Sequence, residues 1–476
     1  MSITEMDQAY VAGTYKRFPV EIVSGKGSRV VDVSGKSYVD MGSGIGVTAF
    51  GFGDEAWMAA VTDQLGKVQH TSNLYYTEPC AKLAKLLCEK TGMKKVFFSN
   101  SGAEANECAI KVARKYSAEK KGMDCYTIVT LRNSFHGRTL TTLAATGQEH
   151  FHQLFQPLTP GFVHVPANDI EELKKCVEEF QVAGILMEVV QGEGGVLPLT
   201  EEYLVAADKL AHEHDIPFMI DEVQTGNGRS GKLYSYMNYP IHPDIVSTAK
   251  GLGGGLPIGA TLLGEKVQSV LGFGDHGSTY GGNPVCCAGA VSVVERLTEA
   301  FLGEVKKKSD YIFTALKDAP GIESVSGLGL MIGVKTVAPA ADVVKACMEK
   351  GVLCLTAKNK VRLLPALNIP MDDLKFAVET LKAAAEELLA EVKQKSDYIF
   401  TALKDTPGVE SVSGLGLMIG VKTVAPAGDV VKTCMERGVL CLTAKNKVRL
   451  LPALNIPMED LKFAVETLKA AAEELA

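Results

Sequence analysis

Residues 217–255 read PFMIDEVQTGNGRSGKLYSYMNYPIHPDIVSTAKGLGGG and contain two short apolar runs, each followed by a charged side chain. The first run ends at Asp221, and the second ends at Lys250, before a glycine-rich turn. Short, nearly continuous apolar runs bounded by polar turns are typical of buried parallel strands. A carboxylate or an amine at the end of such a strand is costly unless a partner is present. This stretch therefore predicts a parallel sheet with two functional candidates at its strand ends.

The same pattern extends over the first 300 residues. Apolar runs occur at 95–100, 125–131, 182–190, 217–223 and 244–250, and amphipathic helical segments occur at 104–120 and 201–215. Strands that alternate with helices indicate an α/β domain with a mostly parallel sheet. Ligands of such sheets bind beyond the carboxyl ends of the strands. The residues that follow each run are therefore the candidate site residues.

Composition limits the class of protein and its partners. The chain has 476 residues, of which 46% are hydrophobic and 22% charged, so we expect two or three domains with a large core. The net charge of -7 argues against a nucleic-acid partner. No apolar run is long enough to span a membrane, and the first residues lack signal-peptide features, so we expect a cytoplasmic protein. The eleven scattered cysteines suggest buried free thiols and no metal site.

Two motifs at strand ends could hold a planar anionic cofactor. Ser101, Gly102 and Ala103 open the helical segment after the run 95–100, and small residues at a helix N-terminus can cradle a phosphate. An ordinary helix cap explains them equally well. Phe135 and Arg138 follow the run 125–131, where the ring could stack on a cofactor and the guanidinium could bind a carboxylate. A surface loop with a packed phenylalanine is the alternative.

Lys250 is the most specific single feature. Burial lowers the pKa of a lysine and makes its amine a usable nucleophile, although a lysine that extends to solvent is the simpler interpretation. Pyridoxal 5'-phosphate needs a phosphate site, a face for its ring, a partner for its pyridine nitrogen and a Schiff-base amine. The strand ends offer all four, so their combination predicts a site for this cofactor.

The motifs together resemble those of the class III, fold-type-I aminotransferases, and within them the acetylornithine branch. The resemblance extends from about residue 10 to residue 388 and is carried by RFPV (17–20), NSGAEANE (100–107), FHGRTL (135–140), AATGQ (144–148), QGEGGV (191–196), DEVQTGNGRSG (221–231), AKGLGGGLPIGA (249–260), HGSTYGGNP (276–284) and VRLLPAL (361–367). It implies a large domain with a seven-stranded, mostly parallel sheet and a small α+β C-terminal domain. The chain departs from the family pattern at Val189, where a proline is usual, and at Phe52-Gly53, where Gly-His is usual.

The resemblance also implies roles for individual residues. Lys250 would form the Schiff base and move the proton, and Asp221 would keep the pyridine nitrogen protonated. The implied cofactor-binding residues are Ser101, Gly102, Ala103, Phe135, Asp221, Val223, Gln224, Lys250 and Thr279, of which Gln224 would reach the ring's phenolic oxygen. Thr279 would act on the partner subunit's phosphate, which implies a homodimer with shared active sites. The implied substrate-binding residues are Arg138 for the donor carboxylate, Arg362 for 2-oxoglutarate, Glu193 as a neutralising partner of an arginine, and Ser278.

An internal repeat sets this chain apart. Residues 304–388 recur at 391–475 with only seven differences, so one α+β module is written twice. We expect an N-terminal segment (1–45) that packs with the small domain, a large cofactor domain (46–300), a small domain (301–390) and its second copy (391–476). No glycine or proline occurs between Pro370 and Pro407, which predicts one helix from the first copy into the second. We expect this helix to carry the second copy away from the site, so that Arg362, not Arg449, is the working arginine.

The resemblance implies transfer of the δ-amino group of N2-acetylornithine to 2-oxoglutarate, in arginine biosynthesis. Succinyldiaminopimelate, succinylornithine, ornithine and 4-aminobutyrate are alternative donors, because a methylene or acyl group changes selectivity by only about 1–3 kcal/mol in an apolar pocket. A fold-type-I aminomutase or decarboxylase would keep Lys250 and Asp221 without needing 2-oxoglutarate. A non-catalytic interaction protein is the third class, and the presence of Lys250, Asp221 and Arg138 argues against it.

Overall fold

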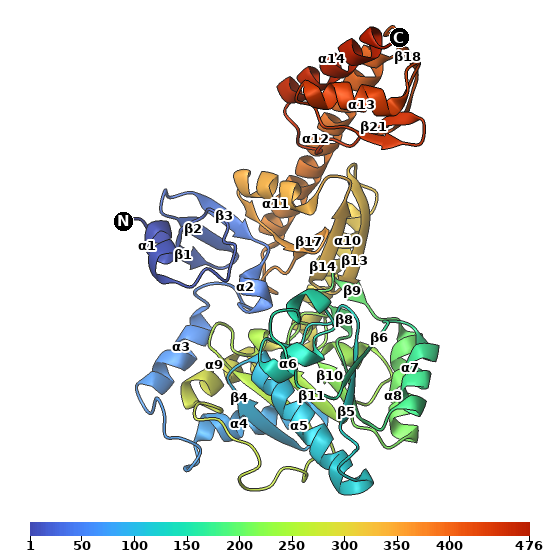
Figure 1. Ribbon diagram of the computed structural model, residues 1–476. Helices are drawn as coiled ribbons and strands as arrows, with labels where there is room; N and C mark the ends of the chain where they lie inside the picture. Colours follow the sequence, from blue (N-terminus) through green and yellow to red (C-terminus); the bar gives the residue numbers. More distant parts are fainter. The chain divides into compact units, whose positions relative to one another are not determined.

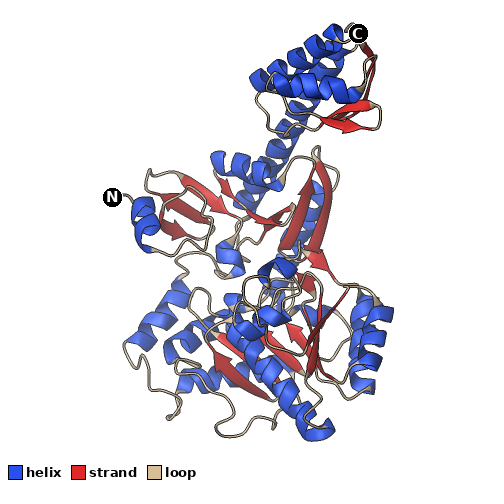
Figure 2. Cartoon of the chain, viewed as in Figure 1, coloured by secondary structure: helices blue, strands red, loops and turns tan.

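Two compact units make up the chain in the computed structural model, which describes residues 1–476. The first unit comprises Met1–Lys317, Ser324–Lys335 and Cys347–Glu379, and the second comprises Asp318–Glu323, Thr336–Ala346 and Thr380–Ala476. Both units contain helices and strands (Figure 1, Figure 2). None of the helices combines the length and the apolar character that a membrane span requires.

A seven-stranded sheet forms the centre of the first unit. Its order is β4 (Lys95–Ser99), β12 (Gly259–Leu263), β11 (Ile245–Thr248), β10 (Phe218–Asp221), β7 (Val182–Met187), β5 (Thr127–Leu131) and β6 (Phe162–Val165). The pairs from β11 to β6 are all parallel, and β12 runs antiparallel to both of its neighbours. The predicted α/β fold with a mostly parallel seven-stranded sheet is confirmed.

Helices lie close to their predicted positions. Helix α5 (Gly102–Lys121) buries Ala105, Ala109 and Ala113, and these small side chains let it lie close to the sheet. Helix α8 (Glu201–Glu213) begins at the Thr200 cap, whose hydroxyl accepts the Tyr203 N–H. The other helices between residues 55 and 296 are α3 (Glu55–Leu65), α4 (Glu78–Thr91), α6 (Leu140–Ala145), α7 (Ile170–Glu179) and α9 (Pro284–Arg296). Three short 3-10 helices lie in the same range: η1 (Glu149–Phe151), η2 (Ser235–Asn238) and η3 (Lys250–Leu252).

The strands are shorter than the predicted apolar runs, and one run is interrupted. The run 182–190 forms β7 only as far as Met187, and a separate short strand, β8 (Val190–Gln191), pairs with β9 (Leu197–Pro198). Glu188 interrupts the run because its carboxylate accepts the backbone N–H groups of Phe135, at 3.0 Å, and Gly192, at 3.3 Å. The prediction of an unbroken strand was wrong since apolar continuity could not reveal this local turn.

The N-terminal residues form a second sheet. After α1 (Ile3–Tyr10), strands β1 (Ile22–Lys26), β2 (Arg29–Asp32) and β3 (Ser37–Asp40) pair in an antiparallel order, and α2 (Ser43–Gly46) follows. Strand β15 (Val352–Leu353) adds to β3 in parallel, so this sheet joins segments more than 300 residues apart in the sequence.

The first copy of the repeat contributes a four-stranded sheet. It contains β13 (Ile322–Leu328), β14 (Met331–Thr336), β17 (Lys360–Leu363) and β16 (Leu355–Ala357), with helices α10 (Glu299–Leu316) and α11 (Ala340–Glu349) in the same stretch of sequence. Strands β14 and β17 are antiparallel, with Gly333 opposite Arg362. This register places Arg362 in a buried strand that lies between β14 and β16.

Residues 391–476 have a sheet and a core of their own. The sheet has the order β18 (Val409–Leu415), β19 (Met418–Thr423), β21 (Lys447–Leu450) and β20 (Leu442–Ala444), and the helices are α13 (Ala427–Glu436) and α14 (Met458–Glu474). Ile399, Ile419 and Leu468 are among its buried residues. Helix α12 (Met371–Leu403) runs without a break from the first copy into the second, which confirms the predicted continuous helix.

Candidate active site

A cavity of about 460 Å³ lies at the carboxyl ends of β10 and β11 in the first unit. It is lined by Val47, Asn100, Ser101, Gly102, Ala103, Asn106, Phe135, His136, Gly137, Arg138, Glu188, Asp221, Val223, Gln224, Ala249, Lys250, Gly255, Leu256, Pro257 and Ile258. The sheet topology thus brings together nine of the residues that the sequence singled out. This is the position at which ligands of open α/β sheets bind.

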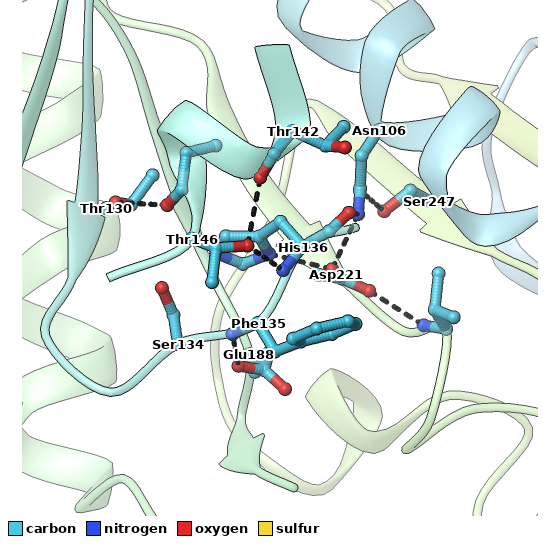
Figure 3. Close-up of polar contacts among 12 residues, drawn as sticks. Asn106, Thr130, Ser134, Phe135, His136, Thr142, Thr146, Glu188, Asp221 and Ser247 are labelled. Carbon is cyan, nitrogen blue, oxygen red and sulfur yellow. Dashed lines mark hydrogen bonds and ion pairs between the residues drawn. The ribbon is translucent and has the colours of Figure 1, made fainter. Parts of the chain in front are cut away.

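Asp221 ends β10 and is the centre of a buried polar network (Figure 3). Its Oδ2 accepts from Asn106 Nδ2 at 2.7 Å and from His136 Nδ1 at 2.8 Å, and its Oδ1 accepts the Val223 N–H at 2.9 Å. His136 Nδ1 is the donor because an ionised carboxylate can only accept. Ser247 donates to Asn106 Oδ1 at 2.5 Å and holds the amide in this orientation. The network orients the Asp221 carboxylate and satisfies most of its lone pairs.

Lys250 follows β11 and occupies an unusual backbone conformation. Its φ of 43° lies in the left-handed region, which is uncommon for a residue with a side chain. Burial lowers the pKa of Lys250, while the charges of Glu193 and Asp221 act to raise it. The amine is therefore held in a protein environment that favours its neutral form more than water does.

The N-terminus of α5 forms one end of the cavity. The Ser101 hydroxyl accepts the Glu104 N–H at 3.2 Å, so the residue caps the helix, and the first helical hydrogen bond is the one from Ala105 N to Ser101 O. The backbone N–H groups of Gly102 and Ala103 precede that bond. A Cβ at Gly102 would lie 2.5 Å from Val223 Cγ1, so only glycine lets the helix end approach the loop after β10. The cap and the anion-binding end are thus the same structure, and the two interpretations of this motif are compatible.

An aromatic group and a cation form another wall. Phe135 is half-buried, and Arg138 is exposed with its guanidinium 5.3 Å from the Phe135 ring centroid and 4.0 Å from that of Phe151. The two rings lie edge to face with centroids 6.1 Å apart. This arrangement keeps Arg138 at the cavity while its charge stays in contact with water.

Arg362 reaches the site from β17. Its Nη1 forms an ion pair with Glu193 and donates to Gln224 Oε1 at 3.1 Å. Gln224 Nε2 donates to Glu193 at 3.2 Å, which closes a three-residue ring of hydrogen bonds. Burial acts to raise the pKa of Glu193, but Arg362 and Lys250 outweigh it and hold that pKa below its ordinary value. Arg362 is only 3% exposed, whereas its counterpart Arg449 is exposed.

Four predicted residues do not line this cavity: Glu193 and Arg362, which contact its lining residue Gln224, and Ser278 and Thr279. Ser278 accepts from Asn100 Nδ2 and from the Gly281 N–H, both at 3.0 Å, and lines a neighbouring cavity of about 520 Å³. Thr279 is exposed and does not line the main cavity. The fold of one chain therefore does not bring Thr279 to Lys250.

Three residues of the site were missed by the sequence analysis: Asn106, His136 and Glu188. His136 and Glu188 are polar side chains that are 2% and 5% exposed. Burial raises the pKa of Glu188 to about 7, and the charge of Asp221 acts in the same direction, although the charge of His136 and the hydrogen bonds from the Phe135 and Gly192 N–H groups act to lower it. Asn106 and His136 both lie inside quoted motifs that follow predicted strands, so their position close to the strand ends was the signal available.

Comparison with known proteins identifies the family. The model of class-III aminotransferases matches residues 10–385 and, a second time, residues 376–472. The chain belongs to this family. Its second match falls on the repeated C-terminal sequence, in agreement with the internal repeat.

Known aminotransferases are similar to this chain over most of its length. The acetylornithine aminotransferase of Haemophilus ducreyi is 51% identical over 388 residues, which cover 81% of this chain and 99% of that protein. The acetylornithine aminotransferase of Methanocaldococcus jannaschii is 42% identical over 396 residues, covering 82% and 98%. Among solved structures, N-acetylornithine aminotransferase from Stenotrophomonas maltophilia has a TM-score of 0.71 and 31% identity, covering 82% of this chain and all of that one. Ornithine aminotransferase from Toxoplasma gondii has a TM-score of 0.78 and 30% identity, covering 82% and 95%.

The cofactor of class-III aminotransferases is pyridoxal 5'-phosphate, and the cavity has the groups that such a cofactor requires. It contains an amine of lowered pKa at Lys250, a buried carboxylate at Asp221, a helix N-terminus and an aromatic side chain at Phe135. His136 Nε2 is also buried there without a partner within the chain. A planar molecule that carries a phosphate and a basic ring nitrogen fits this donor set.

Proposed function

We propose that this aminotransferase transfers the δ-amino group of N2-acetylornithine to 2-oxoglutarate, a reaction of arginine biosynthesis. The products are N-acetylglutamate 5-semialdehyde and glutamate. The names of the relatives, together with the ion pair between Arg362 and Glu193, support this assignment. Ornithine, succinylornithine, succinyldiaminopimelate and 4-aminobutyrate are the alternative amino donors.

The observation that carries the proposal is the Arg362–Glu193 pair beside Lys250. A transaminase must accept two substrates that differ in their number of carboxylates. With the pair closed, the arginine charge is neutralised and a substrate end without a carboxylate can lie beside it. With 2-oxoglutarate, a substrate carboxylate replaces Glu193 as the partner of Arg362. Glu193 is thus a counter-ion of Arg362 that a carboxylate of the acceptor can replace.

Lys250 performs the proton transfer in this proposal. With pyridoxal phosphate and substrate bound, its Nζ would take the proton from the substrate carbon that bears the amino group and would later return a proton. Burial lowers the pKa of Lys250, which favours the neutral amine that the first step requires. Glu193 and Asp221 lie close enough to influence its charge, which stabilises the protonated form between the two transfers.

The remaining cavity residues hold the cofactor. Bound pyridoxal phosphate supplies an electron sink and carries the amino group between the two half-reactions. Asp221 holds a proton on the ring nitrogen, and the Asn106 and His136 hydrogen bonds orient its carboxylate for this task. Gly102 and Ala103 at the start of α5 bind the phosphate through their N–H groups.

Side chains of the loops complete the cofactor contacts and orient the donor. Phe135 and Val223 line the cavity and would hold the ring, and Ser101 and Gln224, which also line it, would contribute polar contacts. Arg138, which remains hydrated at the cavity, binds the α-carboxylate of the donor. Ser278 contacts substrate from the neighbouring cavity.

We further propose a homodimer with shared active sites. Thr279 is exposed on the chain's surface, so it is available to reach a phosphate bound by a second subunit. Light scattering of the purified protein should then give twice the mass of one chain. In addition, Thr279→Ala should weaken cofactor binding without changing that mass. The cytoplasmic location expected from the sequence stays a prediction.

A donor panel tests the reaction. Each candidate amine is mixed with 2-oxoglutarate and the purified holoenzyme, and glutamate formation is followed. We expect the highest kcat/KM for N2-acetylornithine. A higher value for ornithine or 4-aminobutyrate would reassign the donor, and turnover of an amine without 2-oxoglutarate would favour the aminomutase or decarboxylase class.

A further inference from the structure

The two copies of the repeat carry the same pair of cysteines in different surroundings. Cys347 and Cys354 in the first copy correspond to Cys434 and Cys441 in the second. The intervening sequences differ only at position 350, where lysine is replaced by Arg437. Any difference in behaviour between the pairs must therefore come from what surrounds them.

In the first copy, the N-terminal sheet covers the cysteines. Strand β3 pairs with β15 beside Cys354, through bonds from Val39 N to Gly351 O and from Met41 N to Leu353 O, both of 2.9 Å. Cys347 and Cys354 are 0% and 3% exposed. The charge of Asp40, on β3, also contributes to a raised pKa of Cys354, after the hydrogen bond with Cys347 and burial.

In the second copy, this cover is missing. Residues 438–440 form no strand, and Leu440 is 85% exposed, whereas its counterpart Leu353 pairs with Asp40 of β3. Leu451 is 47% exposed, whereas its counterpart Leu364 is fully buried. Cys441 is partly exposed and lines a cavity of about 550 Å³ in this copy, while Cys434 lies buried directly behind it in the core.

The two thiols of the second copy are in contact. They share a side-chain hydrogen bond, which lowers the pKa of Cys434 and raises that of Cys441, as the corresponding bond does for Cys354 in the first copy, so exposure of the sulfur and not its pKa distinguishes the two pairs. Cys434 lies in the last turn of α13 (Ala427–Glu436). The chain that follows the helix folds back on this residue, since Val439 N donates to Cys434 O at 2.9 Å. This short loop brings an accessible sulfur and a buried sulfur together, which is the arrangement of an attacking thiol and a resolving thiol.

We propose that Cys434 and Cys441 are a thiol–disulfide exchange site for a low-molecular-weight disulfide, and that the covered pair Cys347–Cys354 is not. The Cys441 thiolate attacks glutathione disulfide, the S–S bond of the oxidant breaks, and one glutathione leaves. Cys434 then attacks the Cys441 sulfur and releases the second glutathione. The protein loses two electrons and two protons, which end on two glutathione thiols, and it gains one S–S bond.

Peptide mapping can distinguish the two pairs in one sample. Trypsin releases Cys434 in TCMER (433–437) and Cys347 in ACMEK (346–350), and each can be found linked to GVLCLTAK. The reduced holoenzyme is incubated with glutathione disulfide, quenched with acid, alkylated and digested. We expect the TCMER-linked peptide to form at least about tenfold faster, because the covered pair reacts only when its cover opens. The pair Cys80–Cys287, which also shares a hydrogen bond, is identified by its own peptides.

Two controls make the result decisive. In denaturant the two linked peptides should form at equal rates, so a difference that persists there would assign the effect to local sequence and overturn the proposal. Cys434→Ser should stop at a stable glutathione adduct on Cys441. Cleavage after arginine identifies this adduct, because residues 438–449 are released only from the second copy. Equal rates in the native protein, or no adduct in Cys434→Ser, would also overturn the proposal.

Discussion

Replacing Arg362 by alanine tests the centre of the proposed site. Arg362 is almost fully buried, and its guanidinium is bound by Glu193 and by Gln224. In the proposed reaction a carboxylate of 2-oxoglutarate takes the place of Glu193. Arg362→Ala therefore removes the cation from the set formed by Arg362, Glu193 and Gln224. It leaves the substrate carboxylate opposite the Glu193 carboxylate. The KM for 2-oxoglutarate should rise, while the donor half-reaction should change less.

The size of the effect follows from the contacts that are exchanged. Loss of one member of a buried ion pair typically costs about 3–5 kcal/mol. Part of that cost is offset here because 2-oxoglutarate must displace Glu193 in the unmodified enzyme. We therefore expect about 3 kcal/mol, which corresponds to roughly a hundredfold rise in KM. Arg362→Lys keeps the charge but not the planar fork, so its effect should be intermediate.

The second copy of the repeat provides the matched control. Arg449 occupies the equivalent position in sequence but is exposed. Steady-state glutamate formation is measured for Arg362→Ala, Arg449→Ala and a chain truncated after Ala390. Arg449→Ala and the truncation should leave KM and kcat within about twofold, as is usual for surface changes. If Arg449→Ala proves to be the damaging substitution, the second copy supplies the working arginine and our assignment of Arg362 is wrong.

Three further predictions concern the cavity. Lys250→Ala should abolish both turnover and the visible absorption band of the lysine-linked cofactor, and normal turnover in this variant would exclude a catalytic role. Asp221→Asn should still bind cofactor but lose about a thousandfold in kcat, or about 4 kcal/mol, because the ring nitrogen loses its anionic partner; near-normal kcat would contradict that role. Glu188 has a raised pKa of about 7 in the folded state, so its contribution to stability is complete below the unfolded pKa and is lost as pH rises through 7. Unfolding free energy should thus fall by up to about 3 kcal/mol between pH 5 and 8, and Glu188→Gln should lack this fall; parallel pH profiles of the two proteins would refute it.

The strand ends were predictable because their signals are local. An apolar run that ends in Asp221 or Lys250 identifies both the strand and the polar residue that follows it, and the parallel topology then requires these ends to meet. The start of α5 was predictable for the same reason, since small and capping residues act on the backbone next to them. The amino-acid sequence was also sufficient for the continuous helix α12, because no residue between Pro370 and Pro407 interrupts it.

Contacts between distant segments were not predictable in this way. The end of β7 at Met187 depends on Glu188 bonding to Phe135, more than 50 residues away in the sequence. The ring formed by Glu193, Gln224 and Arg362 likewise joins three separate segments. A hydrogen-bond partner of this kind leaves no periodicity in the sequence, so only the folded chain reveals it.

The repeat separates the two kinds of information most clearly. Its sequence alone determined that residues 304–388 and 391–475 have nearly the same local propensities, and both stretches form a four-stranded sheet with helices. Tertiary structure alone decided that Val352 and Leu353 form a strand while Val439 and Leu440 do not. The physical reason is that a strand needs a partner for its backbone groups, and β3 provides one only for the first copy. Whether Cys354 is covered and Cys441 is partly exposed depends on that same neighbour, which local sequence cannot encode.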